Sequence, residues 1–196
     1  MLLVGNHSAG KSSFINWYVG QKIQRVGTAM ETSGFTFITS GKKRESLTGE
    51  ATINLLPHMK GLKDCARVSD CITTEIVTSR EKSFPLITFV DSPGLIDNAE
   101  YPYDIDAALK WLGRSANLVF VFFDPIGQAL RKHTLDVVES MCSDENSDYK
   151  KMHFYLSKAD SAGDARARQK VMIQMSKDLY GEPNKRPVKV HNGSSI

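Results

Sequence analysis

The feature that most constrains the fold of this chain is a glycine-rich loop near its N-terminus, Gly5-Asn6-His7-Ser8-Ala9-Gly10-Lys11-Ser12. It matches the pattern G-x-x-x-x-G-K-[ST], in which the glycines let the backbone curl so that its amides point inward. An apolar strand at Leu2–Val4 precedes the loop and a helical pattern at Lys11–Val19 follows it. This context separates the loop from an ordinary glycine-rich turn.

The chemistry of this loop is phosphate binding. Inward-pointing amides and the N-terminus of the following helix attract phosphate groups. Lys11 is expected to reach the β- and γ-phosphates of a nucleotide as a point charge, and Ser12 to offer its hydroxyl to magnesium. We assign nucleotide contact to the whole loop and to Ser13, which follows it.

Apolar runs with strand character alternate with helical patterns along the chain. Strands are expected at Leu2–Val4, Phe35–Thr39, Ala51–Leu55, Leu86–Val90, Leu118–Phe123, Met152–Leu156 and Val188–Val190, and helices at Lys11–Val19, Asp104–Gly113, Gln128–Cys142 and Ala165–Tyr180. The alternation predicts a largely parallel sheet flanked by helices. Together with the phosphate loop, it indicates an α/β fold of the P-loop NTPase type, with a mostly parallel central sheet and helices on both faces. Ligands of such folds bind beyond the carboxyl ends of the strands.

A second motif, Asp91-Ser92-Pro93-Gly94, directly follows the expected strand Leu86–Val90. An aspartate at the end of a buried strand can hold magnesium through water. A glycine three residues later can offer its backbone amide to a γ-phosphate. Asp91 and Gly94 therefore predict a loop that senses whether that phosphate is present.

A third motif, Ser157-Lys158-Ala159-Asp160, follows the expected strand Met152–Leu156. It is similar to the [NT]-K-x-D signature of GTPases. Asp160 can accept hydrogen bonds from N1–H and the 2-amine of guanine, while the Lys158 stem can pack along the base. An unpaired buried carboxylate would disfavour adenine. Ser157 stands where Asn or Thr is usual, and its shorter side chain weakens the link to the phosphate loop.

Together the three motifs resemble those of the dynamin superfamily G domain. The stretch Ser8-Ala9-Gly10-Lys11-Ser12-Ser13 is similar to the dynamin phosphate loop, and the similarity continues to Val19-Gly20. A gap-free alignment from Gly5 places the switch threonine of the family on Thr32. The resemblance implies that the Thr32 hydroxyl closes over magnesium, with Thr28 and Thr36 as alternatives.

The later part of the chain resembles the EH-domain branch and sarcalumenin-like proteins still more. The similar residues are Asp91-Ser-Pro-Gly-Leu95, Trp111-Leu112, Phe122-Phe123-Asp124 and Ser157-Lys-Ala-Asp160. Because the EH-domain branch uses ATP, the resemblance leaves ATP open beside GTP. The segment Gly41–Pro85 falls outside the resemblance and is expected to be an insertion, for which the sequence indicates no role.

Two departures concern catalysis. Leu95 stands where Ras-like enzymes have a catalytic Gln, and His7 stands where dynamins have a polar Gln in the phosphate loop. Ser8 matches the dynamin residue that helps to neutralise transition-state charge with a cation. The resemblance thus implies catalytic roles for Ser8, Lys11, Thr32 and Gly94, and an arginine finger has only Arg25 and Arg80 as candidates.

Composition limits the alternatives. A net charge of +3 gives no reason to expect nucleic-acid binding. Three cysteines, without the short spacing of a zinc site, indicate reduced thiols and a cytoplasmic protein. The longest apolar runs, such as Leu118–Phe123, are far shorter than the roughly 20 residues of a membrane span. We expect residues 1–196 to form one domain that lacks residues at both ends.

These observations predict a magnesium-dependent GTPase, with GTP or GDP as the bound nucleotide. The resemblance further implies a homodimer across the nucleotide face and peripheral membrane association through regions outside the chain. Two alternatives stay open: an ATPase of the EH-domain type, and a nucleotide-dependent interaction module with negligible turnover.

Overall fold

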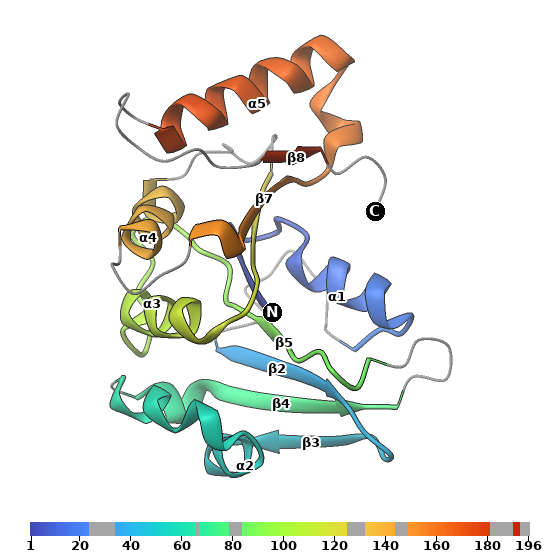
Figure 1. Ribbon diagram of the computed structural model, residues 1–196, viewed down its shortest axis with the longest axis vertical. Helices are drawn as coiled ribbons and strands as arrows, with labels where there is room; N and C mark the ends of the chain where they lie inside the picture. The colour runs from blue at the N-terminus through green and yellow to red at the C-terminus, as the bar shows by residue number, and fades with distance from the viewer. Residues whose placement is uncertain are drawn as a thin grey trace.

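A single sheet runs through the whole molecule (Figure 1). The computed structural model describes residues 1–23, 34–65, 67–78, 84–124, 132–143, 149–180 and 190–192. Within them the strands are β1 (Leu2–Gly5), β2 (Phe35–Ser40), β3 (Glu45–Thr48), β4 (Ile72–Val77), β5 (Phe89–Asp91), β6 (Val119–Phe123), β7 (Met152–Leu156) and β8 (Val190–Asn192). Their order across the sheet is β3-β4-β2-β5-β1-β6-β7-β8.

The strand directions confirm a mostly parallel sheet. Strand β1 is parallel to both neighbours, β5 and β6, and β6, β7 and β8 continue in the same direction. Strand β2 is antiparallel to β5 but parallel to β4, and β3 is antiparallel to β4. The carboxyl ends of β5, β1, β6 and β7 therefore lie along the same edge, where the predicted motifs begin.

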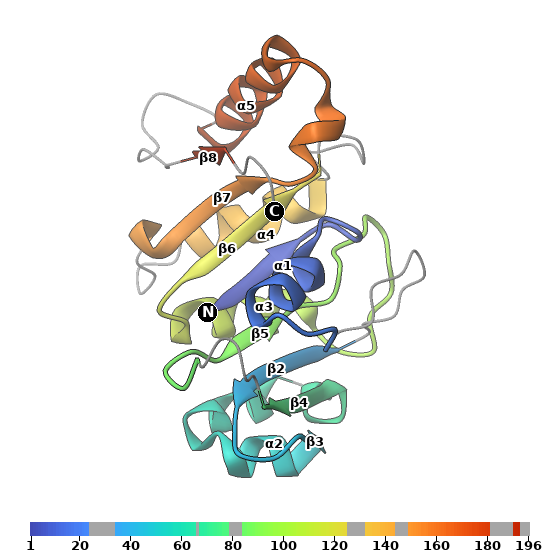
Figure 2. The same cartoon turned by 90° about the vertical axis from the view of Figure 1, so that its right-hand side faces the viewer.

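Helices cover both faces of this sheet. They are α1 (Lys11–Val19), α2 (Gly49–Leu55), α3 (Ile105–Ser115), α4 (Lys132–Cys142) and α5 (Ala165–Tyr180), with 3-10 turns η1 (Pro57–Asp64), η2 (Val68–Cys71), η3 (Tyr149–Lys151) and η4 (Ala159–Ala162). Helices α3 and α4 lie on one face and α1 on the other, as Figure 2 shows with α1 toward the viewer. None of these helices combines the length and apolar character needed to cross a bilayer.

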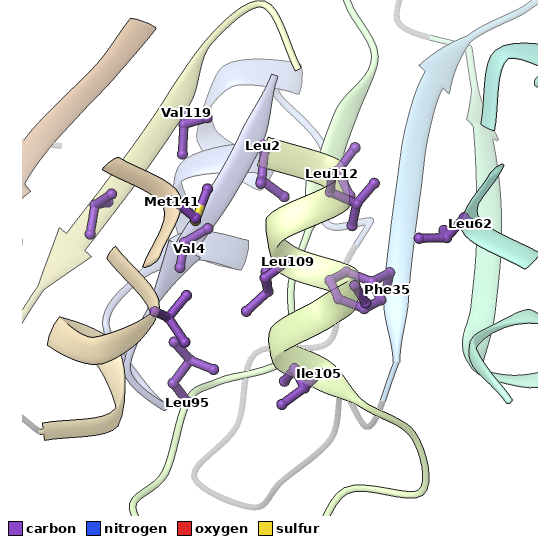
Figure 3. Close-up of a cluster of buried hydrophobic side chains, with 14 of the residues drawn as sticks. Leu2, Val4, Phe35, Leu62, Leu95, Ile105, Leu109, Leu112, Val119 and Met141 are labelled. Carbon is purple, nitrogen blue, oxygen red and sulfur yellow. The ribbon is translucent and has the colours of Figure 1, made fainter. Parts of the chain in front are cut away.

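The alternation of side chains along β1 explains the two layers of the core. Leu2 and Val4 point to the face of α3 and α4, where they pack with Leu109 and Met141 (Figure 3). Leu3, between them, belongs to the cluster beneath α1. All the side chains of β1 are buried, as a central strand covered on both faces requires.

Most of the predicted elements are confirmed by the structure. The bounds of α1, β7 and α5 agree with those predicted, and Asp104 caps α3 by accepting a hydrogen bond from the Ala107 amide. Strand β5 is shorter than predicted and begins at Phe89, the first of its residues to pair with β2, while Leu86 is 95% exposed. The predicted residues Gln128–Arg131 and Val188–Lys189 lie outside the described residues.

The predicted strand Ala51–Leu55 is wrong, because these residues belong to α2. Thr52, Ile53 and Leu56 are buried while Leu55 is exposed, which is the spacing of a helix with one face on the core. A short apolar run does not by itself distinguish a strand from a buried helix. Here the packing against neighbouring elements decides the conformation.

The segment Gly41–Pro85 also holds two strands that the sequence analysis missed, β3 and β4. Strand β4 pairs with β2 along its whole length, from Phe35 opposite Ile72 to Ser40 opposite Val77. Its residues, Ile-Thr-Thr-Glu-Ile-Val, are mostly β-branched, which was a usable strand signal. The segment therefore extends the sheet at the β2 edge.

Replacing Leu109 by Ala should destabilise the fold, since Leu109 is 0% exposed between β1 and α4. We expect the free energy of unfolding to fall by about 2–5 kcal/mol. Leu86→Ala is the matched control and should change it by about 0.5 kcal/mol or less. Urea denaturation followed by circular dichroism measures both. Equal losses in the two variants would contradict the assigned start of β5.

Candidate functional site

The three predicted motifs meet at the carboxyl ends of adjacent strands. Gly5 ends β1, Asp91 ends β5 and Ser157 directly follows β7. Asp91 pairs with Leu3 of β1, and the Ser157 amide donates to the Phe123 carbonyl at the end of β6 over 2.8 Å. The parallel sheet thus gathers segments more than 150 residues apart in the chain into one site.

The phosphate loop wraps around a buried ammonium group. Lys11 is 6% exposed, and its Nζ donates to the carbonyl oxygens of Gly5 and Asn6 over 3.0 Å each. Burial lowers the pKa of Lys11 to about 8, although the Asp91 charge acts in the opposite direction. Ser8 and Gly10 adopt left-handed backbone conformations at φ 60° and 86°, which give the loop its curl. The Ser8 and Ser13 side chains are exposed.

Asp91 and Ser12 form the centre of the candidate metal site. Asp91 is fully buried, and Ser12 Oγ donates to its Oδ2 over 2.6 Å. Burial raises the pKa of Asp91, while Lys11 and the Ser12 hydrogen bond lower it. A serine hydroxyl beside a carboxylate is a donor set that suits magnesium.

Two motif side chains have buried atoms without a hydrogen-bond partner among the described residues, Asp91 Oδ1 and Asn6 Nδ2. Buried polar atoms nearly always have a partner, whether protein, water or ligand. Asp91 Oδ1 is therefore placed to accept from a metal-bound water. The residues fit a magnesium ion held by Ser12 and, through water, by Asp91.

The loop that contains Gly94 lies directly on the phosphate loop. The His7 amide donates to the Leu95 carbonyl over 3.3 Å, and the Leu95 amide donates to the Gly5 carbonyl over 3.1 Å. A Cβ atom on Gly94 would lie 2.5 Å from His7 Cα, so only glycine fits there. The Leu95 side chain is buried in the core and cannot orient a water molecule in the site.

The Ser157–Asp160 motif borders the same loop. A Cβ on Gly10 would lie 3.8 Å from Ser157 Cβ, in ordinary contact. Ser157 Oγ donates to the Phe123 carbonyl over 3.0 Å, and Lys158 Nζ donates to Asp124 Oδ2 over 2.7 Å. Asp160 is exposed, with one weak hydrogen bond from Ser161 at 3.4 Å.

Several predicted residues are not brought into the site by the described structure. Thr32, the alternative Thr28, and the arginine-finger candidates Arg25 and Arg80 lie outside the described residues. Thr36 lies within β2, where its hydroxyl accepts a hydrogen bond from Thr73 over 3.2 Å.

Sequence reasoning also missed contacts of the site. Asp124 follows β6 at the same sheet edge as the motifs, so the strand-end rule could have indicated it. Thr134 donates to Asn6 Oδ1, and His133 and Tyr101 contact the loop around Gly94. Thr134 and Asn6 are 128 positions apart, and no local pattern indicates their contact.

Comparisons with known proteins agree with this geometry. The Dynamin family model matches residues 1–146. EH domain-containing protein 3 of Rattus norvegicus and EH domain-containing protein 2 of Mus musculus are each 23% identical over 168 residues, covering 82% of this chain and 30% of the relative. The chain thus spans about 30% of the length of these curated relatives.

Solved structures share the fold. A chain of an oligomerised bacterial dynamin pair superposes with a TM-score of 0.67 at 15% identity, over 97% of this chain and 32% of that one. A dimerization-deficient mutant of Toc33 from Arabidopsis thaliana gives 0.56 at 16% identity, over 97% and 68%. The family model covers well over half of the sequence, and its match includes the phosphate loop and Asp91–Gly94. The chain is a G domain and belongs to the dynamin family.

Proposed function

We propose that this G domain binds GTP with magnesium and hydrolyses it. The observation that carries the proposal is the cluster of Lys11, Ser12 and Asp91, in which Lys11 and Asp91 are buried and Asp91 Oδ1 has no protein partner among the described residues. An ammonium, a hydroxyl and an open carboxylate oxygen beneath a ring of amides are what a magnesium triphosphate needs. An ordinary turn has no reason to bury these groups together.

The chemical step would be in-line attack of water on the γ-phosphorus. Lys11 and the amides of Gly5–Ser13 would stabilise the negative charge of the β- and γ-phosphates. Gly94 would donate its amide hydrogen to the γ-phosphate. Bound magnesium would neutralise charge on the phosphates. Thr32 would add a second hydroxyl to the metal, and Ser8, exposed at the rim of the loop, would support charge in the transition state.

Guanine recognition would depend on Asp160. Its exposed carboxylate can accept from N1–H and the 2-amine, and Asp124 holds the ammonium of Lys158 at 2.7 Å, which fixes the stem that would pack along the base. ATP is the second candidate, because Ser157 stands where GTPases usually have Asn or Thr and the chain is similar to EH domain-containing proteins, a branch that uses ATP.

Self-association would complete the site. The Leu95 side chain is buried, so the position that carries the catalytic Gln in Ras-like enzymes supplies nothing to an attacking water. A second copy facing the nucleotide could supply the missing group, and the bacterial dynamin pair of similar fold is oligomerised. Without that partner the domain would act as a nucleotide-dependent interaction module with negligible turnover. We further propose a cytoplasmic protein with peripheral membrane contact through regions outside this chain.

Lys11→Ala should abolish binding of both GTP and ATP analogues, because it removes the buried cation that faces the β- and γ-phosphates. Lys60→Ala is the matched control, since Lys60 is exposed on η1. Isothermal titration calorimetry with magnesium measures both variants. Unchanged affinity in Lys11→Ala would refute the phosphate-binding role of the loop.

Asp160→Asn should move the base preference from guanine to xanthine, since the amide can donate to the 2-carbonyl of xanthine. A lost charge-assisted hydrogen bond is worth about 1.5–3 kcal/mol, so losing both contacts should weaken GTP binding on the order of 100-fold or more. Asp136→Asn, an exposed change on α4, is the control. If the wild type prefers ATP and Asp160→Asn keeps that preference, ATP is the substrate.

A further inference from the structure

The first turn of α4 contacts both loops of the nucleotide site through two adjacent residues. Thr134 is fully buried and donates its hydroxyl proton to Asn6 Oδ1 in the phosphate loop. The His133 amide donates to Asp97 Oδ1 over 3.0 Å, and its ring lies against the loop that follows Gly94. One helical turn therefore connects the two segments that would face the γ-phosphate.

Side chains hold the loop after Gly94 at three backbone groups, the Gly94 carbonyl and the amide and carbonyl of Ile96. Tyr101 donates its hydroxyl proton to the Gly94 carbonyl over 2.9 Å and accepts from the Ile96 amide over 3.2 Å. His133 Nδ1 lies 3.3 Å from the Ile96 carbonyl, and the His133 and Tyr101 rings are 6.3 Å apart. Tyr101 and His133 thus hold this loop in addition to the backbone hydrogen bonds that join Leu95 to Gly5 and His7.

The contacts of the His133 ring require its charged form. Nδ1 faces the Ile96 carbonyl, and Nε2 lies 2.8 Å from Asp106 Oδ1 of α3, so both ring nitrogens face oxygen acceptors. A neutral imidazole has one N–H and can donate to only one of them, whereas the imidazolium donates to both. The geometry is therefore complete only when His133 is protonated.

The charges around His133 also favour its protonated form. Among the described residues, the titratable groups that face it are Asp106 from α3 and Asp97 and Tyr101 from the loop. Burial lowers the pKa of His133, but the hydrogen bonds to Asp106 and Ile96 and the two carboxylate charges outweigh it, and the pKa is raised. A raised pKa means that this stabilisation is present in acid and is lost as the pH rises through the folded-state value.

We propose that the first turn of α4 is a protonation-dependent clamp, in which His133 is a positioning residue that holds the Gly94 loop against the phosphate loop. The proposal rests on the proposed nucleotide function, because it regulates how the Gly94 amide meets the γ-phosphate. With His133 protonated, the loop is fixed in place for the triphosphate. Loss of the proton leaves one N–H on the ring, so either the Ile96 carbonyl loses its donor or the ring loses the Asp106 hydrogen bond that fixes it beside the loop. In both cases the loop is held less firmly.

The first experiment tests, without nucleotide, whether His133 holds the loop after Gly94. Amide hydrogen exchange of residues 94–101, expressed as protection factors, is measured across the titration of His133, which is followed by NMR of the ring. The Ile96 amide donates to the Tyr101 hydroxyl, so its protection reports whether the loop is held in place. It should fall about tenfold as His133 deprotonates, the lower limit for losing the charge-assisted hydrogen bond to the Ile96 carbonyl. His133→Gln should have low protection at every pH, whereas His58→Gln, an exposed change on η1, should behave as the wild type.

The charge pair is tested by a second set of variants. Asp106→Asn should move the wild-type transition in protection to lower pH, because it removes the carboxylate that favours the imidazolium. Asp136→Asn makes the same chemical change on α4 without contact to the loop and should leave the transition in place. This pair keeps the test decisive if His133→Gln does not fold.

Nucleotide affinity then tests whether protonation of His133 affects binding of the triphosphate. The affinity ratio of a non-hydrolysable GTP analogue to GDP should fall with the same pH transition in the wild type and be independent of pH in His133→Gln. Wild-type protection that does not follow the His133 titration would overturn the clamp, even if nucleotide binds. Absent triphosphate binding together with pH-dependent protection would refute the proposed function and support the clamp.

Discussion

The site depends on the burial of one carboxylate. Asp91 is removed from water at the end of β5, and a buried charge is costly unless its surroundings compensate for it. The compensation comes from Lys11 and Ser12, which the first turn of α1 presents beside it. Strands β1 and β5 must therefore be neighbours and parallel, and α1 must begin where the phosphate loop ends. The rest of the sheet extends outward from this pair.

Local signals allowed much of the fold to be predicted. The bounds of α1, β7 and α5 follow from apolar spacing and turn residues near each element, and the three motifs lie at strand ends as the alternation of strands and helices requires. Strand β6 likewise begins only one residue after the predicted start, because its apolar run is continuous. Where residues close to one another in the sequence determine an element, the sequence pattern was sufficient to predict it.

The failures share a different physical cause. Residues Ala51–Leu55 form a helix because Thr52 and Ile53 pack beneath neighbouring elements, which no local pattern indicates. The contact of Thr134 with Asn6 and the grip of His133 on the Ile96 carbonyl join residues that are far apart in sequence. Such contacts arise from the folded sheet, which brings the start of α4 beside two loops. Sequence reasoning could name the motifs but not the side chains that position them.

The close approach of Gly94 to His7 has a mechanical consequence. There is no room for even a methyl group between the two backbones, so the contact has almost no slack. A movement of the Gly94 backbone toward His7 must therefore displace the phosphate loop, because no flexible side chain lies between the two backbones to absorb it. The residue that follows His7, Ser8, is exposed, so only one residue separates this tight contact from the molecular surface.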